Sequence, residues 1–356
     1  MRWRVCIFFV IFTSFTLYSA EYLYPVYVND STAFLIYQKN PYHIELWEYD
    51  RGSKQAMQLL LSRCTPAGFQ ILPDQRGFSF IDNGVIKIKS FLKRSARSLE
   101  LDAPIYQLEL LHWIDERHFY ASGRYQDIFG IFQIDYDGTV LPLCLSDEID
   151  SMYPQKIDNI LFYIERDSQW GYSVCKVPYS PIDGDSFKDR VTHYYDQNVV
   201  AQKIISFDEN PITFLKMVSQ TEGFLVGHPP AVSRADREIP FDYYRIRLDA
   251  DDWHVEKIFS FIIKGELLLL GSPLRLYESL LPLLPRHDGS TIIYTSAIGP
   301  ISYLYQYDLE SGISRRLNDT EHLFPPIAQL AGGIIDDSIV AVRMGDVGVQ
   351  MDLAHV

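Results

Sequence analysis

A three-part strand pattern recurs along this chain of 356 residues and limits its fold more than any other feature. The clearest copy, Pro285–Leu317, begins with the turn PRHDG, a β-branched run, STIIYTS, and an alternating aromatic run, ISYLYQYD. The turn LESG and the short run ISRRL complete this copy. Apolar residues that alternate with polar ones between turn-forming residues predict antiparallel strands joined by hairpins.

The same pattern repeats at intervals typical of a β-propeller. The second long strand of successive copies ends at Asp50, Phe91, Asp135, Val177, Asp249, Asp308 and Asp352. The intervals between these positions are 41, 44, 42, 72, 59 and 44 residues. Four of the six intervals fall within the roughly 40–50 residues of a four-stranded blade. The two longer intervals contain the insertions YSPIDGDSFKDRVTHYYDQN and GHPPAVSRADREIP.

A blade that is apolar on both faces must pack against two neighbours, which a ring of blades provides. We therefore predict an all-β fold, a β-propeller of seven four-stranded antiparallel blades, as one domain over residues 21–356. Six blades is the alternative if Pro181–Gln197 and its neighbours belong to one enlarged blade. To close the ring, we expect Glu21–Val28 to pair with the last blade, built from SIVAVRM and GVQMDL.

The segment Pro285–Leu317 resembles the repeat of TolB-type, WD40-like β-propeller proteins. That repeat has a Pro-Asp-Gly turn, a strand ending Phe/Tyr-x-Ser, a strand ending in Asp, and then Gly and a closing Leu. The segment LPDQRGFSFID keeps Pro73 and Asp74 of this motif, but Gln75 replaces the glycine. The resemblance implies the propeller fold. TolB proteins also carry an α/β domain ahead of the propeller, and we expect none here because the repeats begin near Ser31.

The first twenty residues have the three parts of a secretory signal peptide. The basic head MRWR precedes the uncharged run VCIFFVIFTSFTL, and YSA follows. The uncharged run is shorter than the roughly 20 apolar residues that a membrane span needs, although an uncleaved anchor is the alternative. We expect residues 1–20 to act as the signal peptide, with cleavage after Ser19 or Ala20. The mature chain, starting at Ala20 or Glu21, would then be periplasmic or extracellular. It would then not be an integral membrane protein.

Composition and charge limit the classes of partner. The chain is 47% hydrophobic and 14% aromatic, which supports a substantial core. Its formal net charge of −14 disfavours nucleic acid as a partner because the phosphate backbone is also negative. We expect a monomer whose partner is a protein or another macromolecule.

The cysteines predict no metal site. Cys64, Cys144 and Cys175 remain after removal of the signal peptide, and no CxxC spacing occurs. A structural zinc site is therefore not expected, and we predict no metal and no cofactor. A bridge between Cys144 and Cys175 is one interpretation, and the favoured one is three buried thiols that pack as small apolar residues.

The sequence contains no catalytic signature that we can identify. No G-x-S-x-G nucleophile elbow occurs. We interpret three polar segments as ordinary polar turns: HWIDERH (His112–His118), HYYD (His193–Asp196) and DADDW (Asp249–Trp253). We therefore expect no catalytic residue and, more broadly, no enzymatic activity.

Four basic residues occupy similar positions in the repeat. Lys39, Arg124, Arg166 and Arg343 lie at the break between the first two phrases of their copies. In a propeller these breaks share one face with the channel entrance, so the four could bind an anionic ligand there. The other interpretation is solvated loop residues. The leading function is thus an exported, non-catalytic binding scaffold in a bacterial envelope. The alternative is a propeller glycoside hydrolase or lyase with channel carboxylates.

Overall fold

The computed structural model describes most of the chain between residues 22 and 355. The described residues are 22–28, 32–40, 43–50, 55–62, 70–74, 76–93, 95–146, 150–167, 171–197, 199–207, 211–228, 238–264, 291–298, 301–316, 329–335, 338–345 and 348–355. The expected signal peptide, residues 1–20, and Cys64 lie outside the described residues.

Within these residues the strands form sheets that follow one another along the chain, and all pairing is antiparallel between sequential strands. The first two sheets contain β1 (Tyr22–Val28), β2 (Thr32–Asn40), β3 (His43–Asp50) and β4 (Gln55–Ser62), then β5 (Gln70–Ile71), β6 (Gly77–Asp82), β7 (Val85–Ser90) and β8 (Arg97–Ser98). The third and fourth contain β9 (Ile105–Trp113), β10 (His118–Tyr125), β11 (Ile128–Asp135) and β12 (Val140–Ser146), then β13 (Asp150–Ile157), β14 (Ile160–Arg166), β15 (Tyr172–Pro178) and β16 (Gln202–Phe207).

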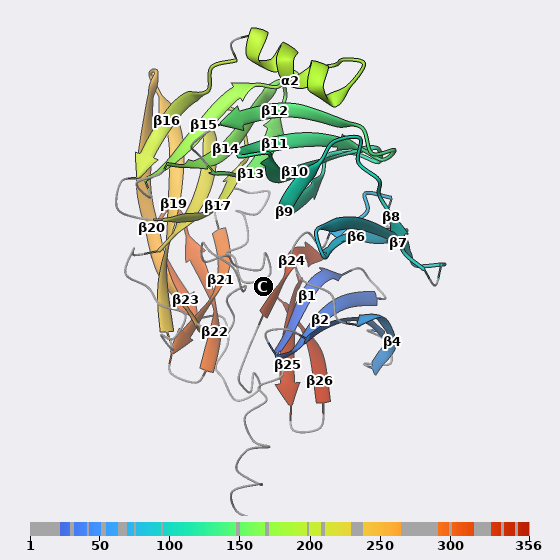
Figure 1. Cartoon of the computed structure of the whole chain (residues 1–356). Coiled ribbons are helices and arrows are strands. Elements are labelled where there is room, and N and C mark those ends of the chain that lie inside the picture. The colour runs from blue at the N-terminus through green and yellow to red at the C-terminus, as the bar shows by residue number, and fades with distance from the viewer. Residues whose placement is uncertain are drawn as a thin grey trace, which may run out of the picture.

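The remaining described strands form one four-stranded and two three-stranded sheets. They are β17 (Ile212–Met217), β18 (Glu222–Gly227), β19 (Glu238–Asp249) and β20 (Asp252–Lys264), then β21 (Thr291–Ile298), β22 (Ile301–Asp308) and β23 (Ile313–Arg316), and finally β24 (Gln329–Ile335), β25 (Ser338–Gly345) and β26 (Gly348–His355). The sheets are arranged around a common centre, with β9, β17 and β24 near the middle and β4, β12 and β20 towards the rim (Figure 1). This is the predicted propeller architecture of successive antiparallel sheets.

The predicted clasp is wrong. β1 pairs with β2 inside the first sheet, in a register that runs from Tyr22 opposite Gln38 to Val28 opposite Ala33. Among the described residues, the last sheet contains β24, β25 and β26. β1 instead lies beside β24 (Figure 1), so the two ends of the described chain meet by packing between sheets and not by a shared strand.

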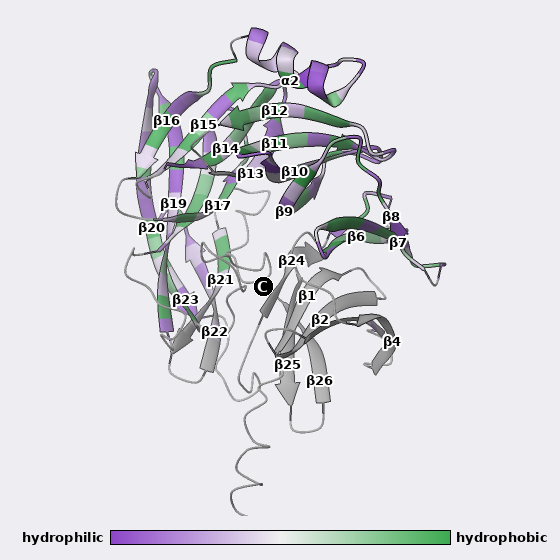
Figure 2. Ribbon diagram, viewed as in Figure 1, coloured by the Kyte–Doolittle hydropathy of each residue, from purple (hydrophilic) through white to green (hydrophobic). Residues whose placement is uncertain are grey.

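The alternating direction of side chains along each strand explains why both faces of the third and fourth sheets are buried. Successive side chains of a strand point to opposite faces of its sheet. In β10, Phe119 and Ala121 belong to a core cluster shared with the second sheet, whereas Tyr120 packs against the fourth sheet. In β14, Leu161 faces the third sheet and Phe162 packs towards the fifth. Hydrophobic residues accordingly recur along these strands (Figure 2).

A helix, α2 (Phe187–Asp196), interrupts the fourth sheet between β15 and β16. It lies over the outer edge of the third sheet, next to β12 (Figure 1). Buried Arg190 of α2 forms an ion pair with Asp102, and the Tyr194 hydroxyl accepts a 3.1 Å hydrogen bond from the backbone N–H of Leu145. The insertion therefore covers an edge that would otherwise present unpaired backbone groups.

The two described cysteines are buried free thiols. Cys144 Sγ donates to the Tyr163 hydroxyl, and Cys175 Sγ donates to Glu165 Oε2, each at 3.3 Å. Burial and the nearby Glu165 carboxylate raise the pKa of the Cys175 thiol. The favoured interpretation of apolar packing is confirmed for these two residues.

Candidate functional site

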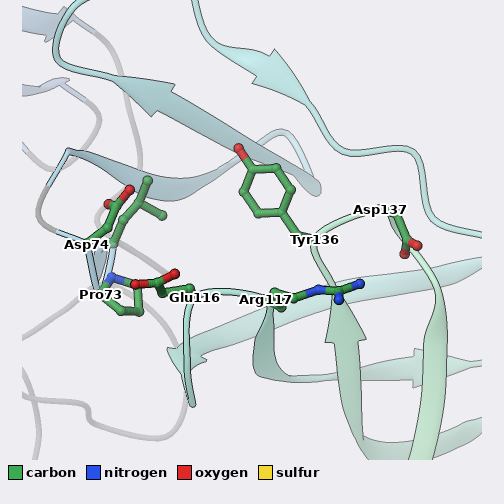
Figure 3. A pocket seen from close by; sticks show the side chains of 7 residues that line it. Pro73, Asp74, Glu116, Arg117, Tyr136 and Asp137 are labelled. Atoms are coloured by element: carbon green, nitrogen blue, oxygen red, sulfur yellow. The ribbon is translucent and has the colours of Figure 1, made fainter.

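A pocket of about 310 Å³ opens where turns of the second and third sheets meet (Figure 3). Three turns contribute to its wall: β5–β6, β9–β10 and β11–β12. The lining residues are Leu72, Pro73, Asp74, Glu116, Arg117, Tyr136 and Asp137. The pocket thus combines a short apolar wall, one aromatic ring, three carboxylates and one guanidinium group.

Local hydrogen bonds fix the two outer turns of the pocket. Asp74 Oδ1 accepts a 2.9 Å bond from the backbone N–H of Arg76. Asp137 Oδ1 accepts one of 3.1 Å from the N–H of Thr139, and this bond lowers the pKa of Asp137 against a small opposing effect of burial. Both carboxylates therefore shape their own turns while staying at the surface.

The β11–β12 turn requires a glycine. Gly138 has φ +100°, and a Cβ there would lie 1.8 Å from the backbone oxygen of Glu100. The Gly138 carbonyl also accepts a 3.0 Å bond from the N–H of Asp102. The close packing of residues 100–102 on this turn holds Tyr136 and Asp137 at the pocket.

The Tyr136 ring is supported from its surroundings. Its centroid lies 6.3 Å from the ring of Trp113, whose indole N–H donates a 2.8 Å bond to Ser79 Oγ of the second sheet. The guanidinium carbon of Arg97 lies 4.8 Å from the Tyr136 ring centroid, and Arg97 also donates to the Tyr136 carbonyl at 2.7 Å. Tyr136 is still 37% exposed, so part of the residue stays accessible at the pocket.

Glu116 and Arg117 project in different directions from the β9–β10 turn (Figure 3). Arg117 points towards Asp137, whereas Glu116 points towards Pro73 and Asp74. The Glu116 side chain makes no hydrogen bond or ion pair with any residue that the structure describes. It is the carboxylate in this pocket that is available to a ligand.

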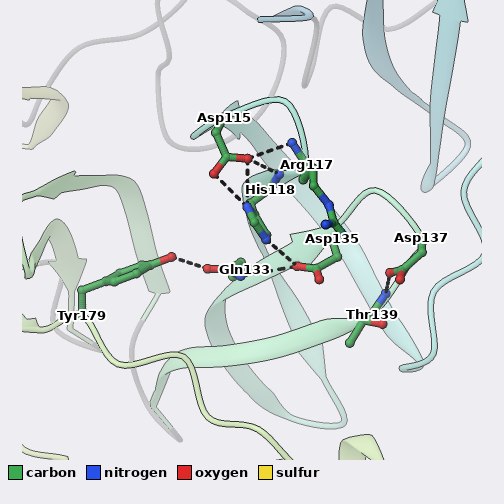
Figure 4. Close-up of polar contacts among 8 residues, drawn as sticks. All are labelled: Asp115, Arg117, His118, Gln133, Asp135, Asp137, Thr139 and Tyr179. Atoms are coloured by element: carbon green, nitrogen blue, oxygen red, sulfur yellow. Dashed lines mark hydrogen bonds and ion pairs between the residues drawn. The ribbon is translucent and has the colours of Figure 1, made fainter.

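A polar network adjoins the pocket on the same turn (Figure 4). His118 Nδ1 lies 2.8 Å from both carboxylate oxygens of Asp115, and His118 Nε2 lies 3.6 Å from Asp135 Oδ1. Gln133 donates to the same Asp135 oxygen at 3.4 Å and accepts a hydrogen bond from the Tyr179 hydroxyl of the fourth sheet. The network therefore links two neighbouring sheets.

The electrostatics of this network follow from burial and hydrogen bonding. Burial opposes ionisation of Asp115, but bonds from the His118 ring and from the N–H groups of Arg117 and His118 outweigh it, so the pKa of Asp115 is lowered. Burial, with Asp115 and Asp135 nearby, raises the pKa of Tyr179 to about 12. The interpretation of HWIDERH as turn polarity agrees with these contacts, because Asp115 and His118 bond within their own turn.

On β9, half-buried His112 stacks on Tyr120 with ring centroids 6.5 Å apart. Burial and the positive charge of Lys216 lower the pKa of His112 to about 4. This histidine is therefore neutral at physiological pH.

The other two polar segments from the sequence lie elsewhere. His193–Asp196 forms the end of α2, and DADDW forms the β19–β20 hairpin, with φ of 48° at Ala250 and 81° at Asp251.

The four basic residues from the sequence lie on the second strands of their sheets. Lys39 is on β2, Arg124 on β10, Arg166 on β14 and Arg343 on β25, each near the hairpin to the third strand. The guanidinium carbon of Arg124 lies 5.6 Å from the Phe129 ring centroid across its hairpin. The Arg124 hairpin stands at the opposite end of the third sheet from the pocket, because β10 runs from the β9–β10 turn, which lines the pocket, to the β10–β11 hairpin.

The sequence did not point to the pocket, although it contained partial signals. Pro73 and Asp74 fall in the degraded repeat motif LPDQRGFSFID, and Glu116 and Arg117 fall in a segment whose pattern predicts an ordinary polar turn. Among the described residues, no group of three or more His, Cys, Asp or Glu side chains is placed to hold a metal ion. In the same described part, no helix is both long and apolar enough to cross a membrane.

Comparison with known proteins identifies the fold. No family model and no curated protein matches the chain. Among solved structures, the chain is similar to the tricorn protease (TM-score 0.52, 10% identity, 84% of this chain and 30% of that one) and to a prolyl endopeptidase (0.54, 8%, 94% and 47%). A putative TolB from Agrobacterium tumefaciens also aligns (0.39, 12%, 76% and 87%).

The chain therefore shares its fold with the aligned parts of the tricorn protease and the prolyl endopeptidase. It spans under a third of the tricorn protease chain and about half of the prolyl endopeptidase. Identities this low indicate a shared architecture and carry no information about activity.

Proposed function

We propose that this protein is an exported, non-catalytic β-propeller that binds another macromolecule through the turns at the ends of its sheets. The observation that carries the proposal is the pocket formed by three turns from two adjacent sheets. Turns that rest on buried strands combine a rigid base with side chains that are free to contact a partner. We place the protein in a bacterial envelope or outside the cell, on the basis of its first twenty residues.

The contacts within the pocket and network favour binding over catalysis. Asp74 and Asp137 each accept a backbone N–H of their own turn, and Asp115 holds His118. These carboxylates maintain the shape of the surface. Glycoside hydrolysis needs two carboxylates that face each other across the substrate, roughly 5–10 Å apart. Because Asp74, Asp137 and Asp115 bond to their own turns, their contacts do not support such a catalytic pair.

The basic residues at the other end of the sheets are proposed as a second contact region. Lys39, Arg124, Arg166 and Arg343 would surround the mouth of a seven-bladed ring and bind carboxylates or other anionic groups of the partner. Their shared position, near the end of a second strand, supports this proposal. Arg124 and Arg166 are half-buried near the ends of β10 and β14, so thermal unfolding must show that a variant at these positions is folded.

Capture of a partner by the mature protein tests this function. The purified chain, immobilised, would be incubated with envelope extract, and the retained partner would be purified and its dissociation constant measured at several salt concentrations. We expect saturable binding that Arg124→Ala with Arg166→Ala weakens and makes less dependent on salt. Absence of any saturable partner would overturn the proposed function, and unchanged binding by the double variant would remove these residues from it.

A further inference from the structure

We propose that the pocket between the second and third sheets binds an arginine side chain from a basic segment of a protein partner. This inference rests on the proposed function and gives the chemistry of one contact. The pocket is lined by Leu72, Pro73, Asp74, Glu116, Arg117, Tyr136 and Asp137. Nothing in the resemblance to other propellers assigns a ligand to these residues.

The charge of the lining selects a cation. Three carboxylates face one guanidinium in the pocket, and Arg117 points towards Asp137 (Figure 3). Arg117 therefore offsets the charge of Asp137, whereas Glu116 points away from Arg117, towards Pro73 and Asp74. Because Glu116 has no partner among the described residues, a guanidinium could bond to it without displacing an internal contact.

The aromatic ring of the pocket favours a planar cation. The guanidinium carbon of Arg97 already lies 4.8 Å from the centroid of the Tyr136 ring, and Arg97 does not line the pocket. Trp113 holds the ring from within the core. A second guanidinium could therefore contact the exposed part of this ring, and arginine stacks on aromatic rings more readily than lysine does.

The size and apolar wall of the pocket suit a single long side chain. A volume of about 310 Å³ lies at the lower end of the range for binding pockets. Leu72 and Pro73 provide an apolar wall beside Glu116, where the methylene stem of an arginine could pack while its charged end reaches the carboxylates. A recess of this size is suited to an anchor residue of a larger interface.

The surroundings of the pocket are complementary to a basic partner segment. Turns at the corresponding end of the third, fourth and fifth sheets carry further carboxylates: Asp115, Asp158, Asp249, Asp251 and Asp252. The chain as a whole has a net charge of −14. This field would attract a basic segment to the end of the molecule that contains the pocket.

Binding of a defined peptide tests the inference. The probe is a fluorescent, terminally blocked peptide Gly-Ser-Arg-Ser-Gly, and its match replaces arginine by citrulline, which keeps the shape and removes the charge. Fluorescence anisotropy would be measured with the mature chain at low ionic strength. We expect saturable binding of the arginine peptide and at least roughly tenfold weaker binding of the citrulline peptide. Equal binding of the two peptides, or binding of neither, would overturn the inference.

Three variants locate the contact. Glu116→Gln should weaken arginine-peptide binding by roughly tenfold, and Tyr136→Leu should weaken it as well. Glu310→Gln, in the β22–β23 turn of the sixth sheet, makes the same change in net charge away from the pocket and should bind like the parent. Thermal unfolding would verify that all three are folded. Equal weakening by Glu116→Gln and Glu310→Gln would show that the peptide responds only to the overall negative charge of the protein, and this would overturn the proposed arginine site.

The partner itself separates this inference from the proposed function. If a captured partner binds Glu116→Gln as tightly as the parent, the arginine pocket is wrong and the binding function stands. If no partner is captured saturably, the proposed function is wrong whatever the peptide result.

Discussion

At the scale of single residues, the carboxylate of Asp115 organises the β9–β10 turn that borders the pocket. Asp115 Oδ1 accepts bonds from the backbone N–H groups of Arg117 at 2.8 Å and His118 at 2.9 Å, and both oxygens lie 2.8 Å from His118 Nδ1. One side chain thereby fixes the positions from which Glu116 and Arg117 enter the pocket and His118 enters the network.

The pH dependence of stability should reveal these bonds. The folded-state pKa of Asp115 lies below its ordinary value of 3.8, so folding favours the ionised carboxylate. This stabilisation is present above about pH 4 and is lost as pH falls through the folded-state pKa. We expect Asp115→Asn to be less stable than the parent at pH 7, with the difference shrinking towards pH 2 in urea unfolding. A difference that stays constant over this range would contradict the assignment.

The Arg190–Asp102 pair is a second residue-scale prediction. The Arg190 side chain is 4% exposed and that of Asp102 is 40% exposed, so loss of Asp102 leaves a buried guanidinium without its carboxylate. We expect Asp102→Asn to lower the free energy of unfolding by about 2 kcal/mol. Asp185→Asn, an exposed change just ahead of α2, is the matched control and should leave stability within about 0.5 kcal/mol.

At the scale of elements, α2 protects the outer strand of the third sheet. Its N-terminus follows Ser186, whose hydroxyl accepts a 3.2 Å bond from the N–H of Asp189 and donates one of 2.7 Å to the Asp189 carboxylate. This capping arrangement starts a helix of only ten residues, and contacts with the sheet must supply the rest of its stability.

The bond from Leu145 to Tyr194 can be tested by hydrogen exchange. Tyr194→Phe keeps the ring packing but removes the acceptor for the Leu145 N–H, so we expect a loss of about 1 kcal/mol and faster exchange of that amide. Tyr195→Phe changes the neighbouring exposed ring and serves as the control. Unchanged protection of Leu145 in Tyr194→Phe would show that the edge is covered by other means.

The sequence predicted the strands well and the helix and pocket poorly, for different physical reasons. Hairpins are local, so alternation and turn residues located β21, β22 and β23 within one or two residues. α2 was not predicted because its surroundings are rich in proline and aspartate, which are typical of loops. The pocket depends on the packing of two sheets, which brings Pro73 to Glu116 and Tyr136 across about 40 to 60 residues of sequence, and no local pattern encodes that contact.

At the scale of the whole molecule, neighbouring sheets are joined chiefly through side chains. A continuous aromatic stack crosses from the fifth sheet into the sixth, through Phe224, Tyr243, Phe259, Tyr294 and Tyr305, with centroid separations of 5.5, 5.1, 4.2 and 5.2 Å. The Ser296 hydroxyl also accepts a 2.9 Å bond from the N–H of Ile262. These contacts join two sheets between which no strand is shared.

The two ends of the described chain also lie side by side, and this gives the last prediction. β1 pairs with β2 in the first sheet and lies beside β24 of the last sheet. Removal of residues 22–28 would therefore leave β2 without its partner strand and β24 without its neighbour. We expect a chain that starts at Asn29 to melt at least roughly 5 °C below one that starts at Tyr22, since a few kcal/mol of stability are lost. The two chains differ only in β1, so the comparison does not depend on residues 1–21. Equal melting temperatures, measured by calorimetry, would show that the contact between β1 and β24 contributes nothing to the stability of the propeller.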